Sequence, residues 1–252
     1  MSLFHKEQKT PAFLTGENQK TLHKNLGFTA LEQYKLLRTN LQFVLSDDEK
    51  CPVIGVTSSV RGEGKSTTAI NLAYVLAENG SKVVLIDGDL RLPVIAKRMN
   101  LKNNVGLTSI LMGQDVRLPD FKTDLSKNLF VIPSGEIPPN PSELLGSKKM
   151  GAFLKELREL FDYVVIDLPP VNIVSDAVSA SPWISGLIIV TREEYTEKRE
   201  LDDCFRQLEL SNVKILGCVM TCARQKHGRY SKYKRYKYYS RYGKYGHNNA
   251  LD

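Results

Sequence analysis

The sequence of 252 residues lacks the features of membrane, secreted and disulfide-rich proteins. It has no run of about 20 apolar residues, the length that a membrane-spanning helix needs. Its first residues show neither a long apolar core nor a small-residue cleavage site, so we expect no secretory signal peptide. The four cysteines form no CxxC pair and show no zinc-ligand spacing. We therefore expect free thiols in a reduced, cytoplasmic protein.

Acidic residues are absent from the segment 224–244, which contains nine Lys and Arg residues. The whole chain has 35 Lys and Arg against 28 Asp and Glu, which leaves 26 basic and 28 acidic residues elsewhere. The positive charge therefore belongs to an appendage and not to the folded domain. We predict a flexible arm over residues 1–26, one domain over 27–223 and a disordered tail over 224–252.

Short apolar runs separated by helical segments organise the predicted domain. The runs have the length of strands and do not alternate between apolar and polar residues, which is typical of strands buried on both faces of a parallel sheet. The predicted strands are 53–57, 83–86, 129–132, 163–166, 186–190 and 214–219. Helical periodicity covers 29–46, 68–78, 148–160 and 198–210, and Thr29 with Glu32 has capping-box spacing at the first helix. This order predicts a doubly wound, mostly parallel α/β fold.

The segment 58–67 follows a predicted strand and opens a predicted helix, the context that a Walker A phosphate loop needs. Glycines let the backbone approach phosphates, and amides at a helix N-terminus attract anions. We expect Lys65 to reach the β- and γ-phosphates of ATP and Ser66 to bind Mg²⁺. Ser59 replaces the usual first glycine of the motif. The predicted nucleotide-binding residues are Ser59, Arg61, Gly62, Glu63, Gly64, Lys65, Ser66 and Thr67.

Three aspartates follow apolar strands. Asp87 and Asp89 end the second strand, and residues two apart in a strand share a face. Asp167 ends a later strand and gives a Walker B pattern with Leu168 and Pro169. Because ligands bind at the carboxyl ends of strands in such sheets, we expect these aspartates to lie near Lys65 and face the γ-phosphate or its Mg²⁺.

The tail concentrates seven of the eleven tyrosines among Lys and Arg residues: Tyr230, Tyr233, Tyr236, Tyr238, Tyr239, Tyr242 and Tyr245. Aromatic and cationic side chains could stack on bases and grip a phosphate backbone, which the composition slightly favours. Alternatively the hydroxyls accept phosphate, which the adjacent ATP site favours. Each phosphotyrosine adds about −1.5 to −2 charges, so full modification would reverse the charge of the tail. An inert, solubilising tail is a third interpretation.

Together these motifs resemble the bacterial tyrosine kinases, in the soluble Gram-positive form that serves capsular or exopolysaccharide synthesis. The resemblance extends from about Thr29 to the tail. It includes the Walker A loop, the second Walker-type motif 85–91, the Walker B motif, the segment 135–145 and the clustered tyrosines. The fold is similar to that of the ParA/MinD group of P-loop ATPases. The signature lysine of that group would fall at Val60, so the chain departs from the ATPase pattern.

The resemblance implies partners that composition and spacing do not show. The family carries an oligomerisation motif, E-x-x-R-x-x-R, which here reads Glu32, Lys35 and Arg38, with Lys in place of the first Arg. Lys and Arg are not equivalent in bidentate pairing. The implied assembly is a ring, possibly an octamer, whose subunits phosphorylate each other's tails. A membrane adaptor would recruit the kinase to the inner face of the membrane and complete its ATP site, and a cognate tyrosine phosphatase would oppose it.

The predicted catalytic residues are Lys65, Asp87, Asp89 and Asp167. Ser66 would bind Mg²⁺ directly, with Asp89 acting through water and Asp167 orienting Ser66 or metal-bound water. Asp87 is the candidate acceptor of the tyrosine proton, although an aspartate near Mg²⁺ should have a low pKa and be a weak base. Two rival hypotheses are a ParA-like ATPase that binds DNA through its tail and a regulatory ATP-binding module without transfer activity. We expect no nucleic acid partner.

Overall fold

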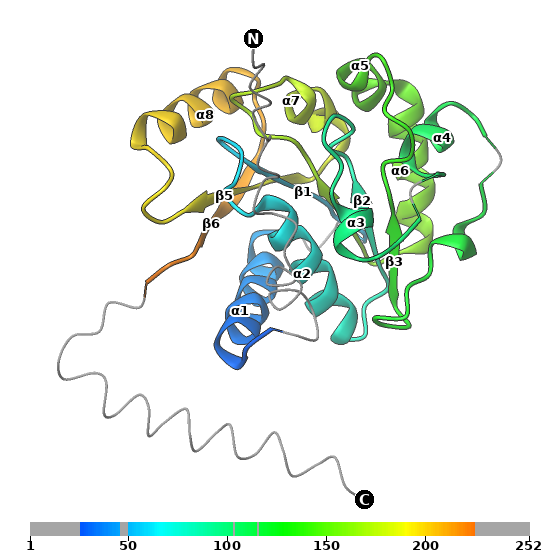
Figure 1. Ribbon diagram of the computed structural model, residues 1–252, viewed down its shortest axis with the longest axis horizontal. Helices are drawn as coiled ribbons and strands as arrows, with labels where there is room; N and C mark the ends of the chain where they lie inside the picture. The colour runs from blue at the N-terminus through cyan, green and yellow to red at the C-terminus, as the bar shows by residue number, and fades with distance from the viewer. Residues whose placement is uncertain (1–25, 46–49, 103, 115, 225–252) are drawn as a thin grey trace, which may run out of the picture.

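All six strands of the central sheet run parallel, in the order β3-β2-β4-β1-β5-β6 (Figure 1). The computed structural model describes residues 26–45, 50–102, 104–114 and 116–224. The predicted α/β fold is confirmed, and each predicted strand is present. The strands are β1 (Val53–Ser58), β2 (Val83–Asp87), β3 (Leu129–Ile132), β4 (Tyr163–Asp167), β5 (Gly186–Arg192) and β6 (Ile215–Thr221).

The four long helices were predicted from periodicity, whereas the short ones were not. The long helices are α1 (Phe28–Val44), α2 (Lys65–Glu78), α6 (Lys148–Leu160) and α8 (Lys198–Leu210). One or two turns are too short to establish a period of 3.6 residues. The short elements are α3 (Ile95–Arg98), α4 (Leu107–Leu111), α5 (Pro141–Gly146) and α7 (Asp176–Ala180), with 3₁₀ turns at Leu118–Phe121 and Ser181–Trp183.

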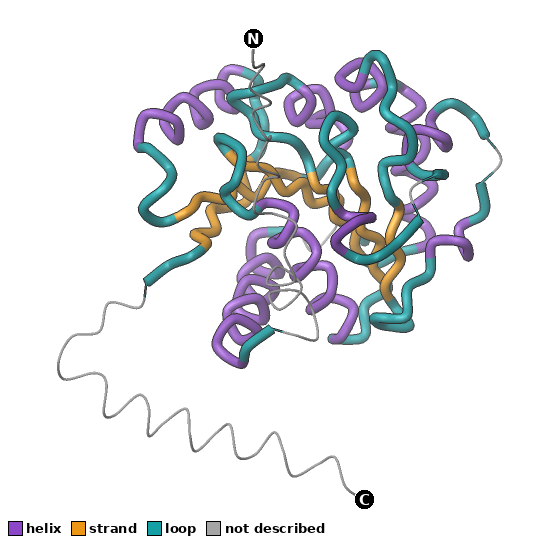
Figure 2. The backbone as a smooth tube through the Cα atoms, viewed as in Figure 1, coloured by secondary structure: helices purple, strands orange, loops and turns teal. Residues whose placement is uncertain are grey.

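Helices cover both faces of the sheet (Figure 2). Helices α1, α2 and α3 pack on one face, and α4 to α8 pack on the other. Successive strand residues serve the two cores alternately, because side chains in a strand point to opposite faces. In β4, for example, Val164 and Ile166 join one core and Val165 joins the other. Burial on both faces explains why the strands read as unbroken apolar runs.

The capping box predicted at α1 is wrong. The helix begins one residue earlier than Thr29, its N-cap is Gly27, and no side chain caps it. Glu32 instead accepts a hydrogen bond from Lys35 Nζ at 2.8 Å. An ion pair one turn along an exposed helix explains the same residue spacing.

The described residues include no helix that is long and apolar enough to cross a membrane. All four cysteines are free thiols. Cys51 and Cys204 are buried, whereas Cys218 and Cys222 are exposed. Burial raises the pKa of the Cys204 thiol to about 12, so it stays protonated near neutral pH.

Gly151 in α6 lies against the indole ring of Trp183. A Cβ atom at this position would lie 2.6 Å from Cε3 of the ring. We predict that Gly151→Ala lowers the free energy of unfolding by about 1–3 kcal/mol, because the clash outweighs the better helix propensity of alanine. Urea unfolding measures the change. In a Trp183→Leu background the same substitution should be neutral or stabilising, and an equal loss there would contradict this explanation.

Candidate active site

The phosphate loop connects the end of β1 to the start of α2. Gly62 and Gly64 adopt φ values of 84° and 98°, a left-handed conformation that strains side-chain-bearing residues. The glycines turn the chain so that α2 begins at Lys65. The amides of the first turn have no partner within the helix and form the positive end of its dipole. The geometry is therefore that of an anion-binding loop.

Lys65 lies at the centre of a cluster of carboxylates. Its Nζ is 2.8 Å from Oδ2 of Asp89 and 3.4 Å from Oδ1 of Asp167. Burial alone would lower the pKa of Lys65, but the charges of Asp167 and Asp89 outweigh it and raise the pKa. The ammonium group therefore stays protonated. The structure thus brings together three of the four predicted catalytic side chains at the carboxyl ends of β2 and β4.

Asp87 has a different environment from Asp89. β2 ends at Asp87, so the two aspartates lie on different parts of the chain, one in the strand and one after it. Asp87 Oδ2 accepts hydrogen bonds from the amides of Val94 and Ile95, at 3.1 and 3.0 Å. Its Oδ1 has no hydrogen-bond partner among the described residues. Burial, and next the charge of Asp167, raise the pKa of Asp87 to about 7.

Three oxygen donors fit a Mg²⁺ ion: the hydroxyl of Ser66 and the carboxylates of Asp89 and Asp167. Ser66 Oγ is 3.4 Å from Lys65 Nζ, so all three donors surround one ammonium group. The buried Oδ2 of Asp167 has no hydrogen-bond partner in the described chain. Mg²⁺ prefers hard oxygen ligands and keeps several waters, which suits a site with two carboxylates and one hydroxyl.

Glu63 explains why Ser59 can replace the usual glycine. The Glu63 carboxylate is fully buried and accepts hydrogen bonds from Ser59 Oγ, at 2.9 Å, and from the amide of Val60, at 2.8 Å. Thr196, which follows β5, donates a further hydrogen bond to it. The side chains of Ser59 and Glu63 thus hold the loop together, so contacts from these two residues to a nucleotide would come from the backbone.

The segment 192–196 donates hydrogen bonds to backbone carbonyls of the phosphate loop. Arg192 donates to the carbonyl of Gly62 at 3.2 Å, and the hydroxyl of Tyr195 donates to the carbonyl of Arg61 at 3.0 Å. Thr221, at the end of β6, donates to the carbonyl of Glu63 at 2.6 Å. With the loop carbonyls satisfied in this way, its amides are left to face an anion.

The segment 135–145 supports the second Walker-type motif. Arg91 binds Asp176 through two hydrogen bonds of 3.0 Å, a bidentate pair. Ser142, in α5, donates to the same buried carboxylate at 2.6 Å. The contacts join the chain after β2 to α5 and α7 and so fix the position of Asp89.

A cleft of about 1240 Å³ opens in front of the phosphate loop. Residues of α1, of the loop itself, of the segment after β2 and of the end of β6 line it. Four large apolar side chains at this cleft are exposed: Leu36, Leu92, Ile173 and Met220.

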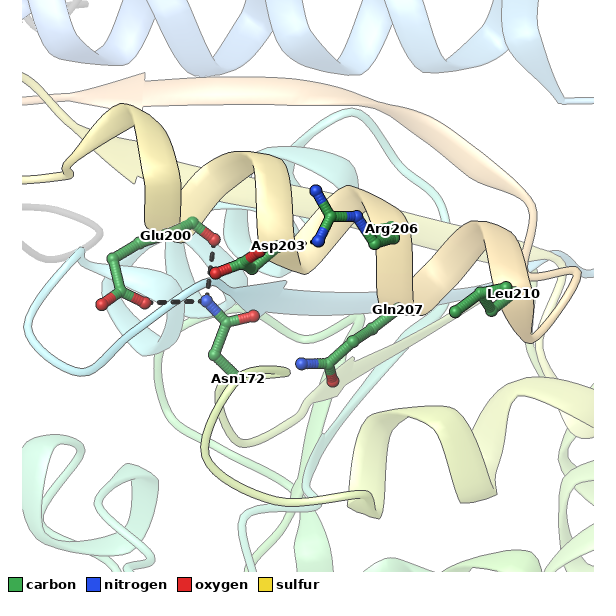
Figure 3. A pocket seen from close by; sticks show the side chains of 6 residues that line it. All are labelled: Asn172, Glu200, Asp203, Arg206, Gln207 and Leu210. Carbon is green, nitrogen blue, oxygen red and sulfur yellow. Dashed lines mark hydrogen bonds and ion pairs between the residues drawn. The ribbon is translucent and has the colours of Figure 1, made fainter.

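A smaller hollow of about 310 Å³ lies between α8 and the loop after β4 (Figure 3). Its main polar contact is internal, because Asn172 Nδ2 donates to the carbonyl and the carboxylate of Glu200 at 2.7 and 2.9 Å. The contact holds the chain after Asp167 against α8. We therefore interpret the residues around this hollow as structural support for the Walker B segment and not as a second binding site.

Comparisons with known proteins agree with this geometry. A family model described as an AAA domain matches residues 51–208. The tyrosine-protein kinase YwqD of Bacillus subtilis (strain 168) is 40% identical over 200 residues, which cover 79% of this chain and 84% of that protein. The chain belongs to the bacterial protein-tyrosine kinases. The family predicted from the motifs is thereby confirmed.

Solved structures give the same family and fold. The crystal structure of the chimerical protein CapA2B2 matches this kinase with a TM-score of 0.76 at 32% identity, over 84% of this chain and 92% of that chain. The septum site-determining protein MinD of Pyrococcus horikoshii OT3, solved with Mg-ADP, matches with a TM-score of 0.57 at 26% identity. That match covers 70% of this chain and 72% of MinD. The predicted relation to the MinD-type fold is also confirmed.

The remaining predicted sites are placed only in part. In the kinase, Arg38 donates to the carbonyl of Val75 in α2 at 3.0 Å, while Glu32 and Lys35 pair with each other. The oligomerisation motif therefore stays a prediction. The seven tail tyrosines predicted to accept phosphate lie outside the described residues.

Several residues of the site were missed by sequence reasoning: Arg98, Arg192, Tyr195, Thr196 and Thr221. None belongs to a Walker motif. Arg192 and Thr221 are the last residues of β5 and β6, so the rule that ligands gather at carboxyl ends of strands could have indicated both.

Thr196 provides a test of the loop support. We predict that Thr196→Val lowers the free energy of unfolding by about 1–3 kcal/mol, because it leaves the buried Glu63 carboxylate short of one donor. It should also weaken binding of Mg·ADP. Thr196→Ser keeps the hydroxyl and serves as the control. Calorimetry and urea unfolding measure both effects, and equal behaviour of the two variants would refute the role assigned to the hydroxyl.

Proposed function

We propose that this kinase transfers the γ-phosphoryl group of ATP to tyrosines of its own C-terminal tail and thereby regulates capsular or exopolysaccharide synthesis and export. One observation carries the proposal: the chain leaves the domain along the cleft. Met220, Thr221, Cys222 and Ala223 line the cleft beside the phosphate loop. The residues that follow include the seven clustered tyrosines. Family membership supports tyrosine as the acceptor.

Phosphoryl transfer needs stabilisation of negative charge more than covalent help from the protein. The tyrosine oxygen forms a bond to the γ-phosphorus, the bond to the bridging oxygen breaks, and ADP leaves. The loop amides and the protonated Lys65 stabilise the charge on the phosphoryl oxygens. Bound through Ser66, Asp89 and Asp167, Mg²⁺ would neutralise further phosphate charge.

The tyrosine proton must pass to a base, because a tyrosine hydroxyl has a pKa near 10 and arrives protonated. We assign Asp87 as the acceptor. Its Oδ1 has no hydrogen-bond partner in the described structure, whereas Oδ2 is held by two amides. One carboxylate oxygen is thus fixed and the other is left to receive a proton.

Three partners belong to the same proposal. A membrane adaptor would cover the exposed apolar side chains at the cleft, since such residues favour burial against another polypeptide. Exposed Glu32 and Lys35 on α1 would contribute to a ring of kinase subunits that phosphorylate each other's tails. A tyrosine phosphatase would remove the phosphate groups again.

The central test is tail phosphorylation in vitro. We expect Mg·ATP, with the adaptor's cytoplasmic segment, to phosphorylate Tyr230 to Tyr245, as read by mass spectrometry. Lys65→Met should reduce the rate about 100-fold or more, because it removes a cation that stabilises the transferring group. ATP hydrolysis without phosphotyrosine would contradict the proposal and favour an ATPase.

A mixing experiment separates reaction in trans from reaction in cis. The full-length Lys65→Met chain would serve as substrate, and a chain truncated after Arg224 would serve as enzyme. Phosphorylated Lys65→Met tails would establish transfer between subunits, and their absence would exclude it.

Asp87 is tested by two substitutions. Asp87→Asn can keep the hydrogen bonds from Val94 and Ile95 but cannot accept a proton, whereas Asp87→Ala loses both functions. We predict that both variants lose phosphorylation about 100-fold or more, while Asp87→Asn keeps the affinity for Mg·ADP. Phosphorylation kinetics and calorimetry provide the two measurements. An active Asp87→Asn variant would contradict the role of Asp87 as proton acceptor and leave it only the hydrogen bonds to Val94 and Ile95.

A further inference from the structure

Arg98 is a basic residue of the cleft that no Walker motif contains. It is the last residue of α3, the short helix that follows β2, and it lines the cleft together with Lys65, Ser66 and Thr67. Its Nη1 donates a hydrogen bond to Thr67 Oγ1 at 2.6 Å. Thr67 stands in the first turn of α2, so the guanidinium group lies beside the amides of the phosphate loop.

Arg98 differs from the other cationic residues described at the cleft in its partners. Lys65 pairs with Asp89, Arg91 pairs with Asp176, and Arg192 donates to the loop backbone. Among the described residues, no carboxylate lies within ion-pair distance of Arg98. Arginine offers five N–H donors in a planar fork, and within the described part of the chain the side chain of Arg98 makes one hydrogen bond, to Thr67.

Partial burial of an unpaired guanidinium is unfavourable unless an anion compensates it. Burial lowers the pKa of Arg98 more than the charges of Asp167 and Asp87 raise it, in line with a charge that is only partly compensated. A phosphate anion bound in the cleft would add to the compensation that Asp167 and Asp87 give the guanidinium from a distance. The cleft faces a loop built for phosphates, which identifies the class of anion.

We propose that Arg98 binds the polyphosphate of the Mg-nucleotide and holds Thr67 in position for the same contact. The Arg98 N–H occupies a lone pair of the Thr67 hydroxyl, which leaves the hydroxyl hydrogen free to donate to a phosphate oxygen. The proposal rests on the nucleotide site assigned under the proposed function. It adds a phosphate-binding residue from outside the Walker sequences.

The test is direct nucleotide binding by the full-length chain, with no phosphoryl transfer required. Calorimetry with Mg·ADP and with a non-hydrolysable Mg·ATP analogue should show Arg98→Met binding about tenfold to hundredfold more weakly than the wild type, the loss expected for charge-assisted hydrogen bonds. Arg98→Lys should recover part of the affinity, because it keeps the charge. Lys97→Met is the matched control, since Lys97 is the neighbouring exposed cation of the same cleft and helix.

Thermal unfolding of the nucleotide-free protein separates binding from structure. Removal of an unpaired, partly buried charge should leave the melting temperature of Arg98→Met equal to or above that of the wild type, while the rise caused by Mg·ADP shrinks. A lower melting temperature without nucleotide, not restored in Arg98→Lys, would mark a structural residue and overturn the proposal.

Two other outcomes have distinct meanings. Arg98→Met that binds nucleotide as tightly as Lys97→Met would overturn the role of Arg98 and leave the proposed kinase function intact. A wild-type chain that binds neither nucleotide would overturn both. Nucleotide binding without tyrosine phosphorylation would refute only the transfer reaction, and the comparison of Arg98 variants would still decide the role of Arg98.

Discussion

The buried ammonium group of Lys65 is the interaction on which the site depends. Asp89 and Asp167 come from the ends of two neighbouring strands, and the ammonium group that contacts both offsets the repulsion between their charges. The parallel sheet brings these strand ends to one edge, and the left-handed glycines place Lys65 at that edge. The cluster therefore forms only when the glycines of the loop adopt their left-handed conformation and the strands are parallel neighbours.

Local patterns were sufficient to predict the elements of this cluster. Strand β3 and helices α6 and α8 begin and end at the predicted residues, because apolar runs and helical periods are properties of neighbouring residues. Lys65, Asp89 and Asp167 were predicted to meet because parallel strands share a direction. The capping box failed because the same spacing, Thr29 to Glu32, also lies within a helix, where Glu32 pairs with Lys35 instead.

Contacts between distant segments could not be predicted in this way. Thr196 and Thr221 bind Glu63 across more than a hundred residues of sequence, and no local pattern assigns a partner to either hydroxyl. The burial that raises the pKa of Asp87 also comes from the packing of the whole sheet and not from neighbouring residues. The motif therefore identifies the phosphate loop, whereas the tertiary structure decides how the loop is supported.

The segment 192–196 has a consequence for how far each tyrosine of the tail can reach. Arg224 is anchored to this region, because its guanidinium pairs with Glu194 at 2.7 Å and its amide donates to Glu193. An extended chain advances about 3.3–3.6 Å per residue, so Tyr230 stays within roughly 20 Å of the anchor and Tyr245 within roughly 75 Å. The position of each tyrosine in the sequence therefore sets an upper limit on its distance from Arg224.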